Sequence, residues 1–188
     1  MDVVRTFVAV LIDQDQRARV AHVQDRAKKL APDVKWVAPE NFHVTLKFLG
    51  SVREDTLPSV YASVDEAVRG FGEFEVSLSG IGAFPDARRA RVVWVGIGSG
   101  RDRLQQLATR VEKSLTDLGF EKDDKGFRAH ITIGRVKTSR FLDDLARGIT
   151  EIDAHDMGTQ KVTSVAVMRS DLRREGPVYT PLKVIDIS

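Results

Sequence analysis

Two short stretches of this chain pair a histidine with a threonine two positions later. They are His43-Val44-Thr45-Leu46 and His130-Ile131-Thr132-Ile133, in a sequence that contains only four histidines. Residues i and i+2 of a β-strand point to the same face, so each stretch would present one imidazole and one hydroxyl on one face while its two aliphatic side chains are buried on the other. Two such strands facing each other would form a cleft with two titratable rings.

Two histidines in one cleft can divide the roles of acid and base. The unperturbed pKa of imidazole is about 6.5, which allows proton transfer in both directions near neutral pH. A displacement at an acyl or phosphoryl centre with a poor leaving oxygen needs both roles at once. Threonine hydroxyls can donate to the charged non-bridging oxygens. The pattern therefore predicts an anionic phosphodiester bound between two pairs, His43 with Thr45 and His130 with Thr132.

Alternation separates a core face from a polar face in both stretches. In the first, the predicted core set is Phe42, Val44, Leu46 and Phe48, and the polar set is His43, Thr45 and Lys47. In the second, the predicted core set is Phe127, Ala129, Ile131 and Ile133, and the polar set is Arg128, His130 and Thr132. One histidine on a polar face is more often an ordinary surface residue, and the repeated context is what favours a site. His22 and His155 belong to no recurring pattern and are interpreted as surface residues.

The elements that must position these residues follow from periodicity. Apolar spacing predicts helices over 20–30, 57–68 and 104–115 and a shorter one near 141–145. Runs of β-branched and aromatic residues predict strands near 5–12, 34–37, 42–49, 73–82, 91–98, 127–136, 161–169 and 178–187. The order strand, helix, His-x-Thr strand, helix, strand therefore occurs twice, starting again near residue 91.

This repeated order indicates an internal duplication. We expect an α+β fold with two lobes related by a pseudo-two-fold axis, built from β-α-β-α-β halves of about 1–90 and 91–188. Each lobe would contribute half of the site. The 188 residues suffice for one core, so 1–188 is expected to be one domain. A site made within one chain needs no partner subunit, which favours a monomer.

Composition excludes several classes of protein. With 42% hydrophobic and 30% charged residues, the chain is an ordinary globular protein without disordered bias. The absence of cysteine excludes disulfides, thiolate metal sites and a cysteine nucleophile, and it fits a reducing compartment. The apolar run 7–12 is too short for a signal-peptide core or a membrane span. We therefore expect a cytoplasmic location and no membrane association.

The net charge of +2 does not indicate a strongly cationic protein. Arginines nevertheless cluster, at Arg88, Arg89 and Arg91 and again at Arg169, Arg173 and Arg174. Such clusters could meet phosphate or could be ordinary solvated surface, and the sequence leaves both interpretations open.

Competing motifs are incomplete. Gly96, Gly98 and Gly100 suggest a dinucleotide loop, but position 101, where its third glycine should fall, is Arg101, so a tight turn is expected. The sequence has neither GxxxxGK[ST] nor HExxH. Two histidines without a matching carboxylate or cysteine set make a poor zinc site. We expect no metal and no cofactor.

The chain resembles the two-histidine phosphoesterase superfamily, and more closely its RNA 2',3'-cyclic phosphodiesterase branch, also called the 2'-5' RNA ligase family. The resemblance extends nearly end to end. Besides the two His-x-Thr motifs and their flanks at 40–50 and 127–137, the matching stretches are 5–10, 36–37, 80–85, 91–96 and 176–182. It implies a two-lobed α+β fold whose antiparallel-rich sheets line a central groove.

The resemblance also implies hydrolysis of RNA 2',3'-cyclic phosphate ends to 2'-phosphate ends without metal. In that assignment His43 donates a proton to the departing 3' oxygen and His130 activates water, while Thr45 and Thr132 bind phosphate oxygens. The residues alone leave the two histidine roles exchangeable. One departure is Ala129, where many members carry proline, and this change should not remove activity.

Arg135 matches a family position near the substrate phosphate. Alternation places it on the same side as Ile131 and Ile133, so a bulge or the end of the strand would have to redirect it. The substrate could be a tRNA fragment, another RNA end or a small cyclic nucleotide. Two other functions stay open: ligation of a 2',3'-cyclic phosphate end to a 5'-hydroxyl, and a non-catalytic RNA- or nucleotide-binding module.

Overall fold

The computed structural model describes residues 2–138 and 140–187, in which helices lie between most of the strands of the first 148 residues and three consecutive strands follow. The helices are α1 (Gln14–Leu30), α2 (Leu57–Val68), α3 (Arg101–Asp117) and α4 (Leu142–Gly148). The strands are β1 (Val3–Leu11), β2 (Lys35–Trp36), β3 (His43–Arg53), β4 (Phe74–Phe84), β5 (Val92–Ile97), β6 (His130–Arg135), β7 (Thr159–Val162), β8 (Ser164–Leu172) and β9 (Pro177–Asp186).

The four predicted helices are confirmed, and their ends have local causes. The Asp13 carboxylate caps α1 by accepting from the Gln16 N–H at 2.8 Å. Gly100, with φ of 77°, lies just before α3 in a left-handed conformation, and this is the tight turn expected there. Within the described residues, none of these helices combines the length and apolar character required to cross a membrane.

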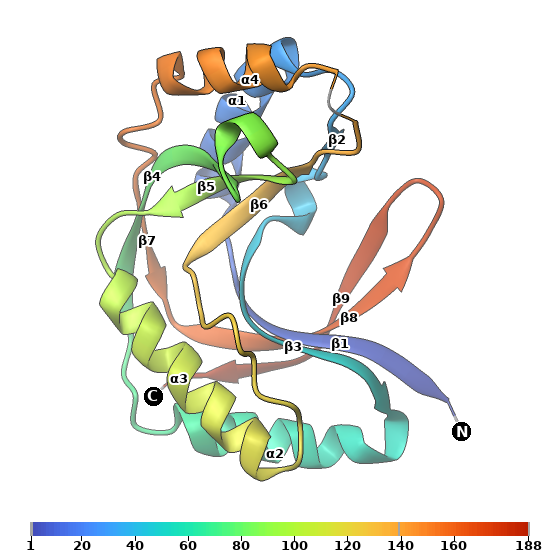
Figure 1. Cartoon of the computed structure of the whole chain (residues 1–188). Coiled ribbons are helices and arrows are strands. Elements are labelled where there is room, and N and C mark those ends of the chain that lie inside the picture. The colour runs from blue at the N-terminus through green and yellow to red at the C-terminus, as the bar shows by residue number, and fades with distance from the viewer. Residues whose placement is uncertain (1, 139, 188) are drawn as a thin grey trace.

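The strands form one curled sheet in the order β7-β4-β5-β6-β3-β1-β8-β9, with β2 added beside β6 (Figure 1). All of the pairings are antiparallel. We call β3, β1, β8 and β9 the first lobe and β6, β5, β4 and β7 the second lobe. The lobes join where β3 meets β6, at the pair Val44 and Ile131. The α+β, antiparallel, two-lobed fold class is confirmed.

The last strand of each repeat lies in the other lobe. Strand β4 comes from the first repeat but pairs with β5, and β8 comes from the second repeat but pairs with β1. The helices are also divided between the lobes. Figure 1 shows α1 and α4 beside the second lobe and α2 and α3 beside the first. Each lobe thus contains strands from both repeats, which ties the two halves of the chain together.

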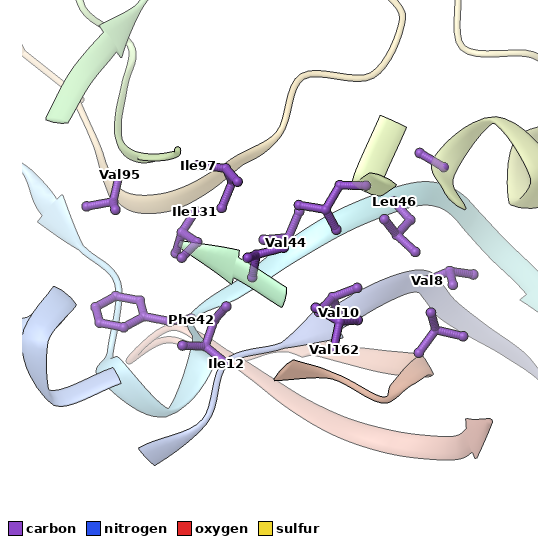
Figure 2. Packing of buried hydrophobic residues seen from close by; sticks show 14 of the residues in the cluster. Val8, Val10, Ile12, Phe42, Val44, Leu46, Val95, Ile97, Ile131 and Val162 are labelled. Atoms are coloured by element: carbon purple, nitrogen blue, oxygen red, sulfur yellow. The ribbon is translucent and has the colours of Figure 1, made fainter. Parts of the chain in front are cut away.

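One hydrophobic core lies between the sheet and the helices. Val44 and Ile131 are buried in it, together with α1 residue Val20, α2 residue Val60 and α3 residue Leu104. Figure 2 shows Val44 and Ile131 next to buried side chains of both lobes. Burial of each such aliphatic side chain contributes roughly 1.5–3 kcal/mol. The strand pair that joins the lobes therefore also contributes to the core.

The prediction that Phe48 is buried and Lys47 faces away from the core is wrong. Val8 pairs with Lys47 and Ala9 with Thr45, which leaves Leu46 as an extra residue in β3. Such a β-bulge places two consecutive side chains on the same side of the strand. Lys47 is accordingly buried beside Leu46, and Phe48 is exposed.

The single strand predicted over 161–169 is also wrong. The strand is interrupted at Thr163. Strand β7 before it pairs with β4, and β8 after it pairs with β1 and β9. The two strands thus belong to different lobes. The β-branched residues Val162, Thr163 and Val165 continue through the break, so the sequence pattern does not mark it.

Candidate active site

The pairing of β3 with β6 brings the two His-x-Thr motifs together. Val44 and Ile131 are matched across the strands and point into the core. Their neighbours in sequence must point to the opposite face of the sheet, which we call the site face. Antiparallel register then puts Thr45 across from His130. By the same register His43 lies across from Thr132, so both lobes contribute to one four-residue cluster.

Both imidazole rings are held in the same way. His43 Nδ1 lies 2.7 Å from the Asn41 carbonyl oxygen, and His130 Nδ1 lies 2.6 Å from the Arg128 carbonyl oxygen. A carbonyl oxygen can only accept, so each Nδ1 carries a proton and donates. In the neutral ring Nε2 is then the basic nitrogen, and in the cation it is the second donor. Each histidine therefore exchanges protons through Nε2.

The His43 ring also contacts its own threonine. Its Nε2 lies 2.9 Å from Thr45 Oγ1. The hydroxyl donates to Nε2 when the ring is neutral and accepts from it when the ring is protonated. Thr45 can therefore stabilise either state of His43 before a substrate arrives.

Aromatic rings lie against both histidines. Tyr179 of β9 meets His43 edge to face with ring centroids 5.2 Å apart, and Phe7 of β1 lies 4.9 Å from the same ring. Phe84 of β4 meets His130 edge to face at 5.0 Å. Because of the strand exchange, Phe84 comes from the other repeat. These rings limit the motion of the imidazoles and shield them from water.

Partial burial lowers the pKa of both histidines below the ordinary value of 6.5. The bonds from Nδ1 to the backbone carbonyls oppose this effect, because they favour the protonated ring. Positive charge lowers the pKa further: His130 and Arg135 act on His43, and Arg135 and Arg128 act on His130. Both rings are thus biased towards the neutral state until an anion balances the positive charge.

Arg135 lies near both histidines, and a bulge in β6 accounts for its direction. Val93 pairs with Gly134 and Trp94 pairs with Thr132, so Ile133 is an extra residue. The Ile133 carbonyl oxygen accepts hydrogen bonds from the Val37 N–H at 2.9 Å and from Gln24 Nε2 at 2.8 Å. The bulge is one of the two causes that the sequence argument allowed, and Arg135, which is also the last residue of β6, is exposed beside the cluster.

The remaining polar candidates lie outside this cluster. His22 on α1 and His155 before β7 are exposed, as expected. In the first arginine cluster, Arg89 pairs with Asp86, and in the second, Arg169 pairs with Asp171. Within residues 2–138 and 140–187, no three histidine, aspartate or glutamate side chains gather where a metal ion could bind.

Sequence reasoning missed the aromatic walls and the backbone acceptors. Tyr179 and Phe84 lie in stretches that supported the family resemblance, but nothing in their spacing connected them to the histidines. The Asn41 and Arg128 carbonyls could have been suggested by their equivalent positions, since each is two residues before its histidine. Only the local backbone shape shows that they accept from Nδ1.

Comparison with known proteins gives one consistent result. The family described as LigT like Phosphoesterase matches twice, over residues 10–94 and 95–179, which confirms the two repeats. The RNA 2',3'-cyclic phosphodiesterase of Methanothermobacter thermautotrophicus is 38% identical, with 96% of this chain and 97% of the relative covered. The protein of the same name from Aeropyrum pernix is 37% identical over 87% of this chain and 92% of the relative.

Solved structures agree with the sequence relatives. The protein TT0787 of Thermus thermophilus superposes with a TM-score of 0.82 at 27% identity and covers 97% of both chains. Escherichia coli LigT complexed with 3'-AMP superposes with a TM-score of 0.81 at 26% identity, over 100% of this chain and 99% of LigT.

Proposed function

The chain belongs to the LigT-like phosphoesterase family, and on that basis we propose that it hydrolyses RNA 2',3'-cyclic phosphate ends to 2'-phosphate ends. The observation that carries the proposal is the matched pair of imidazoles. Each donates from Nδ1 to a carbonyl two residues earlier, and each leaves Nε2 for chemistry on the same face of the sheet. Two such groups can serve as the acid and base of a phosphoryl displacement.

The proposed reaction is a single in-line displacement. His130 Nε2 accepts a proton from water as the water oxygen attacks phosphorus. The bond from phosphorus to the 3' oxygen breaks, and His43 Nε2 donates its proton to that oxygen. The products are a 2'-phosphate and a free 3'-hydroxyl, and solvent returns both rings to their starting states. The family resemblance is what assigns the acid role to His43.

Threonine and arginine would stabilise the charge that develops on the phosphate. The Thr45 and Thr132 hydroxyls lie beside the rings on the site face and can donate to non-bridging oxygens. Arg135 would add a positive charge there, and its lowering of the pKa of both histidines supports this role. These donors need no metal ion, so we propose metal-independent catalysis.

End-group analysis in the presence of EDTA tests the reaction directly. A short RNA, such as a tRNA fragment, that ends in a 2',3'-cyclic phosphate should be converted to a product that ends in a 2'-phosphate. A 3'-phosphate product would contradict the assignment. Loss of activity in EDTA that returns with added metal would contradict metal independence.

The rate should depend on pH in a bell-shaped manner, with its maximum on the acidic side of pH 6.5. Below the lower apparent pKa both rings are protonated and the base is missing, and above the higher one both are neutral and the acid is missing. Because the pKa of both rings is lowered in the free protein, the midpoint of the kcat/KM profile lies below the ordinary imidazole value.

Arg135→Gln should move this maximum to higher pH, because it removes a positive charge that lowers the pKa of both histidines. The measurement is kcat/KM against pH for both proteins, and Arg147→Gln on α4, whose partner is Asp144, is the control. A non-catalytic binding module would show no hydrolysis, and its affinity for the RNA end would instead strengthen monotonically as the pH falls and the rings become protonated.

Ligation would use the same groups with a 5'-hydroxyl in the place of water. An assay that supplies paired tRNA halves, one with a 2',3'-cyclic phosphate and one with a 5'-hydroxyl, measures both outcomes at once. We further propose a cytoplasmic monomer, since the chain lacks cysteine and its candidate site draws on both lobes of one chain.

A further inference from the structure

Asn41 is a buried residue that forms hydrogen bonds in two directions. Its backbone carbonyl accepts from His43 Nδ1 at 2.7 Å, and its side-chain Nδ2 donates to the Pro177 carbonyl at 2.8 Å. Pro177 lies 136 positions further along the chain and is the first residue of β9. Asn41 is only 9% exposed, and burial of an amide is costly unless the amide is hydrogen-bonded. The bond to Pro177 is therefore part of the packing beside the proposed site.

This bond supports the outer end of the hairpin that β8 and β9 form. Strand β8 pairs with β1 over residues 166–169, so residues 170–179 continue beyond that pairing as a two-stranded ribbon. Figure 1 shows this end of the hairpin projecting away from the sheet. A ribbon of two strands has little stability by itself. Asn41 gives it a fixed point at Pro177, two residues from Tyr179, whose ring lies 5.2 Å from that of His43.

The same bond restricts the carbonyl that holds His43. This carbonyl belongs to the peptide between Asn41 and Phe42. The Phe42 side chain is buried in the core and fixes one end of that peptide, and the Asn41 side chain fixes the other. A peptide held at both ends has little freedom to turn its carbonyl away from Nδ1. The direction of the carbonyl in turn decides which ring nitrogen of His43 carries the proton.

The second repeat contains a comparable arrangement. Arg128 also lies two residues before its histidine, and its carbonyl accepts from His130 Nδ1 at 2.6 Å. Its guanidinium lies over the Phe84 ring, 5.4 Å from the centroid, and Phe84 meets His130 edge to face. In both repeats, the residue whose carbonyl holds the imidazole thus also contacts the strand that supplies an aromatic neighbour. Asn41 differs in that it is buried and makes this contact by a hydrogen bond.

We propose that Asn41 is a positioning residue for His43: the bond from its amide to Pro177 keeps its carbonyl on His43 Nδ1 and keeps Tyr179 against the ring. This inference deepens the proposed function, on which its kinetic test rests. Asn41 acts through His43, because both of its bonds go to other protein groups. Its removal should change proton transfer by His43 more than it changes substrate binding.

Loss of the amide should lower the pKa of His43 further. Burial lowers this pKa, and the bond to the Asn41 carbonyl opposes that effect. The other titratable and charged groups that face this ring, or Tyr179 beside it, are unchanged in the variant: His130 and Arg135 on β6, Tyr179 on β9 and Arg5 on β1. The midpoint of the kcat/KM profile is the mean of two apparent pKa values. It should therefore fall by roughly a third to a half of a pH unit, opposite in sign to the shift in Arg135→Gln.

The first measurement is nitrogen-15 and proton NMR of the histidine side chains in the free protein. It shows which ring nitrogen carries the proton and how fast that proton exchanges with water. In Asn41→Ala the His43 Nδ1–H should exchange about fivefold faster, which corresponds to the loss of about one net hydrogen bond. His130, held by Arg128, should be unchanged and is the internal reference. Asn41→Ser, whose hydroxyl is too short to reach Pro177, is a milder variant with the same expected result.

The second measurement is hydrolysis of an RNA 2',3'-cyclic phosphate end against pH. In Asn41→Ala kcat near neutral pH should fall about tenfold with KM nearly unchanged, the lower end of the range for groups that orient metal-bound histidines. Gln16→Ala is the matched control, since it removes another buried amide, whose Nε2 donates to the Thr159 carbonyl at 3.0 Å. It should lower Tm and leave the pH midpoint and the His43 signals unchanged.

Three results would overturn the proposal. The first is an unchanged His43 exchange rate and pH midpoint in folded Asn41→Ala. The second is an equal change at His43 and His130, which would indicate general loosening of the fold. The third needs no variant: rapid exchange of the His43 Nδ1–H in the wild-type protein. Absence of cleavage by the wild-type protein would instead contradict the proposed function, and the NMR measurement would still test the role of Asn41.

Discussion

Replacement of either His43 or His130 by alanine is expected to lower kcat for an RNA 2',3'-cyclic phosphate end by on the order of 100-fold to 10,000-fold. Each change removes one of the two Nε2 atoms that exchange protons in the proposed displacement. The rings are only partly buried, so folding should survive in both variants. The measurement is single-turnover hydrolysis in EDTA, with circular dichroism to confirm the fold.

The matched controls are His22→Ala and His155→Ala, which truncate the two exposed histidines outside the cluster. Both controls should retain wild-type rates. The kcat of the double variant of His43 and His130 should be only slightly lower than that of the less active single variant. The reason is that the effects of groups that act together in one transition state are strongly non-additive. Full activity in either single variant would exclude the proposed mechanism.

Lys47→Met is expected to destabilise the protein by about 3 kcal/mol, since the change breaks a buried ion pair by removing one partner. The Lys47 side chain is only 2% exposed, and its Nζ donates to Glu112 Oε1 at 2.8 Å and to the Glu121 carbonyl at 2.7 Å. Glu112 is 22% exposed, so water relieves part of the loss. For a chain of this size the expected decrease in Tm is roughly 6–12 °C.

This ion pair also supports the segment that leads to His130. Glu112 Oε1 accepts from the Asp123 N–H at 3.1 Å, so β3, α3 and the following loop share one polar contact. Adding Glu112→Gln to Lys47→Met should recover part of the stability, because the remaining charge is then removed. Lys161→Met is the control: its partner Glu73 and Lys161 itself are both well exposed, and such pairs contribute little. Equal Tm values for Lys47→Met and the wild type would contradict the interpretation.

The directions of the two histidines could be predicted because alternation is a local property of a strand. Each His-x-Thr stretch is flanked by aliphatic residues at every second position, and the register confirms that Val44 and Ile131 face the core. The helices were equally predictable, since a period of 3.6 residues and suitable caps act within one segment.

Bulges were not predictable from the same pattern. A bulge depends on the partner strand, because it is a mismatch in the number of residues between two paired strands. Lys47 and Phe48 were therefore assigned to the wrong faces, and the direction of Arg135 was left dependent on a bulge or a strand end that the sequence could not locate. The break at Thr163 has a similar cause, since it divides one run of strand-forming residues between partner strands in different lobes.

Two His-Thr pairs in equivalent places of two repeats follow from the chain alone, because periodicity and duplication are patterns within the sequence. Three other features exist only in the folded molecule: β3 and β6 meet at Val44 and Ile131, β4 and β8 exchange lobes, and backbone carbonyls hold both Nδ1 atoms. The first two depend on contacts between segments far apart in the sequence, and the third on the backbone shape that those contacts impose. The free energy that stabilises these three features comes from burial and strand pairing between different segments, so no single segment determines them.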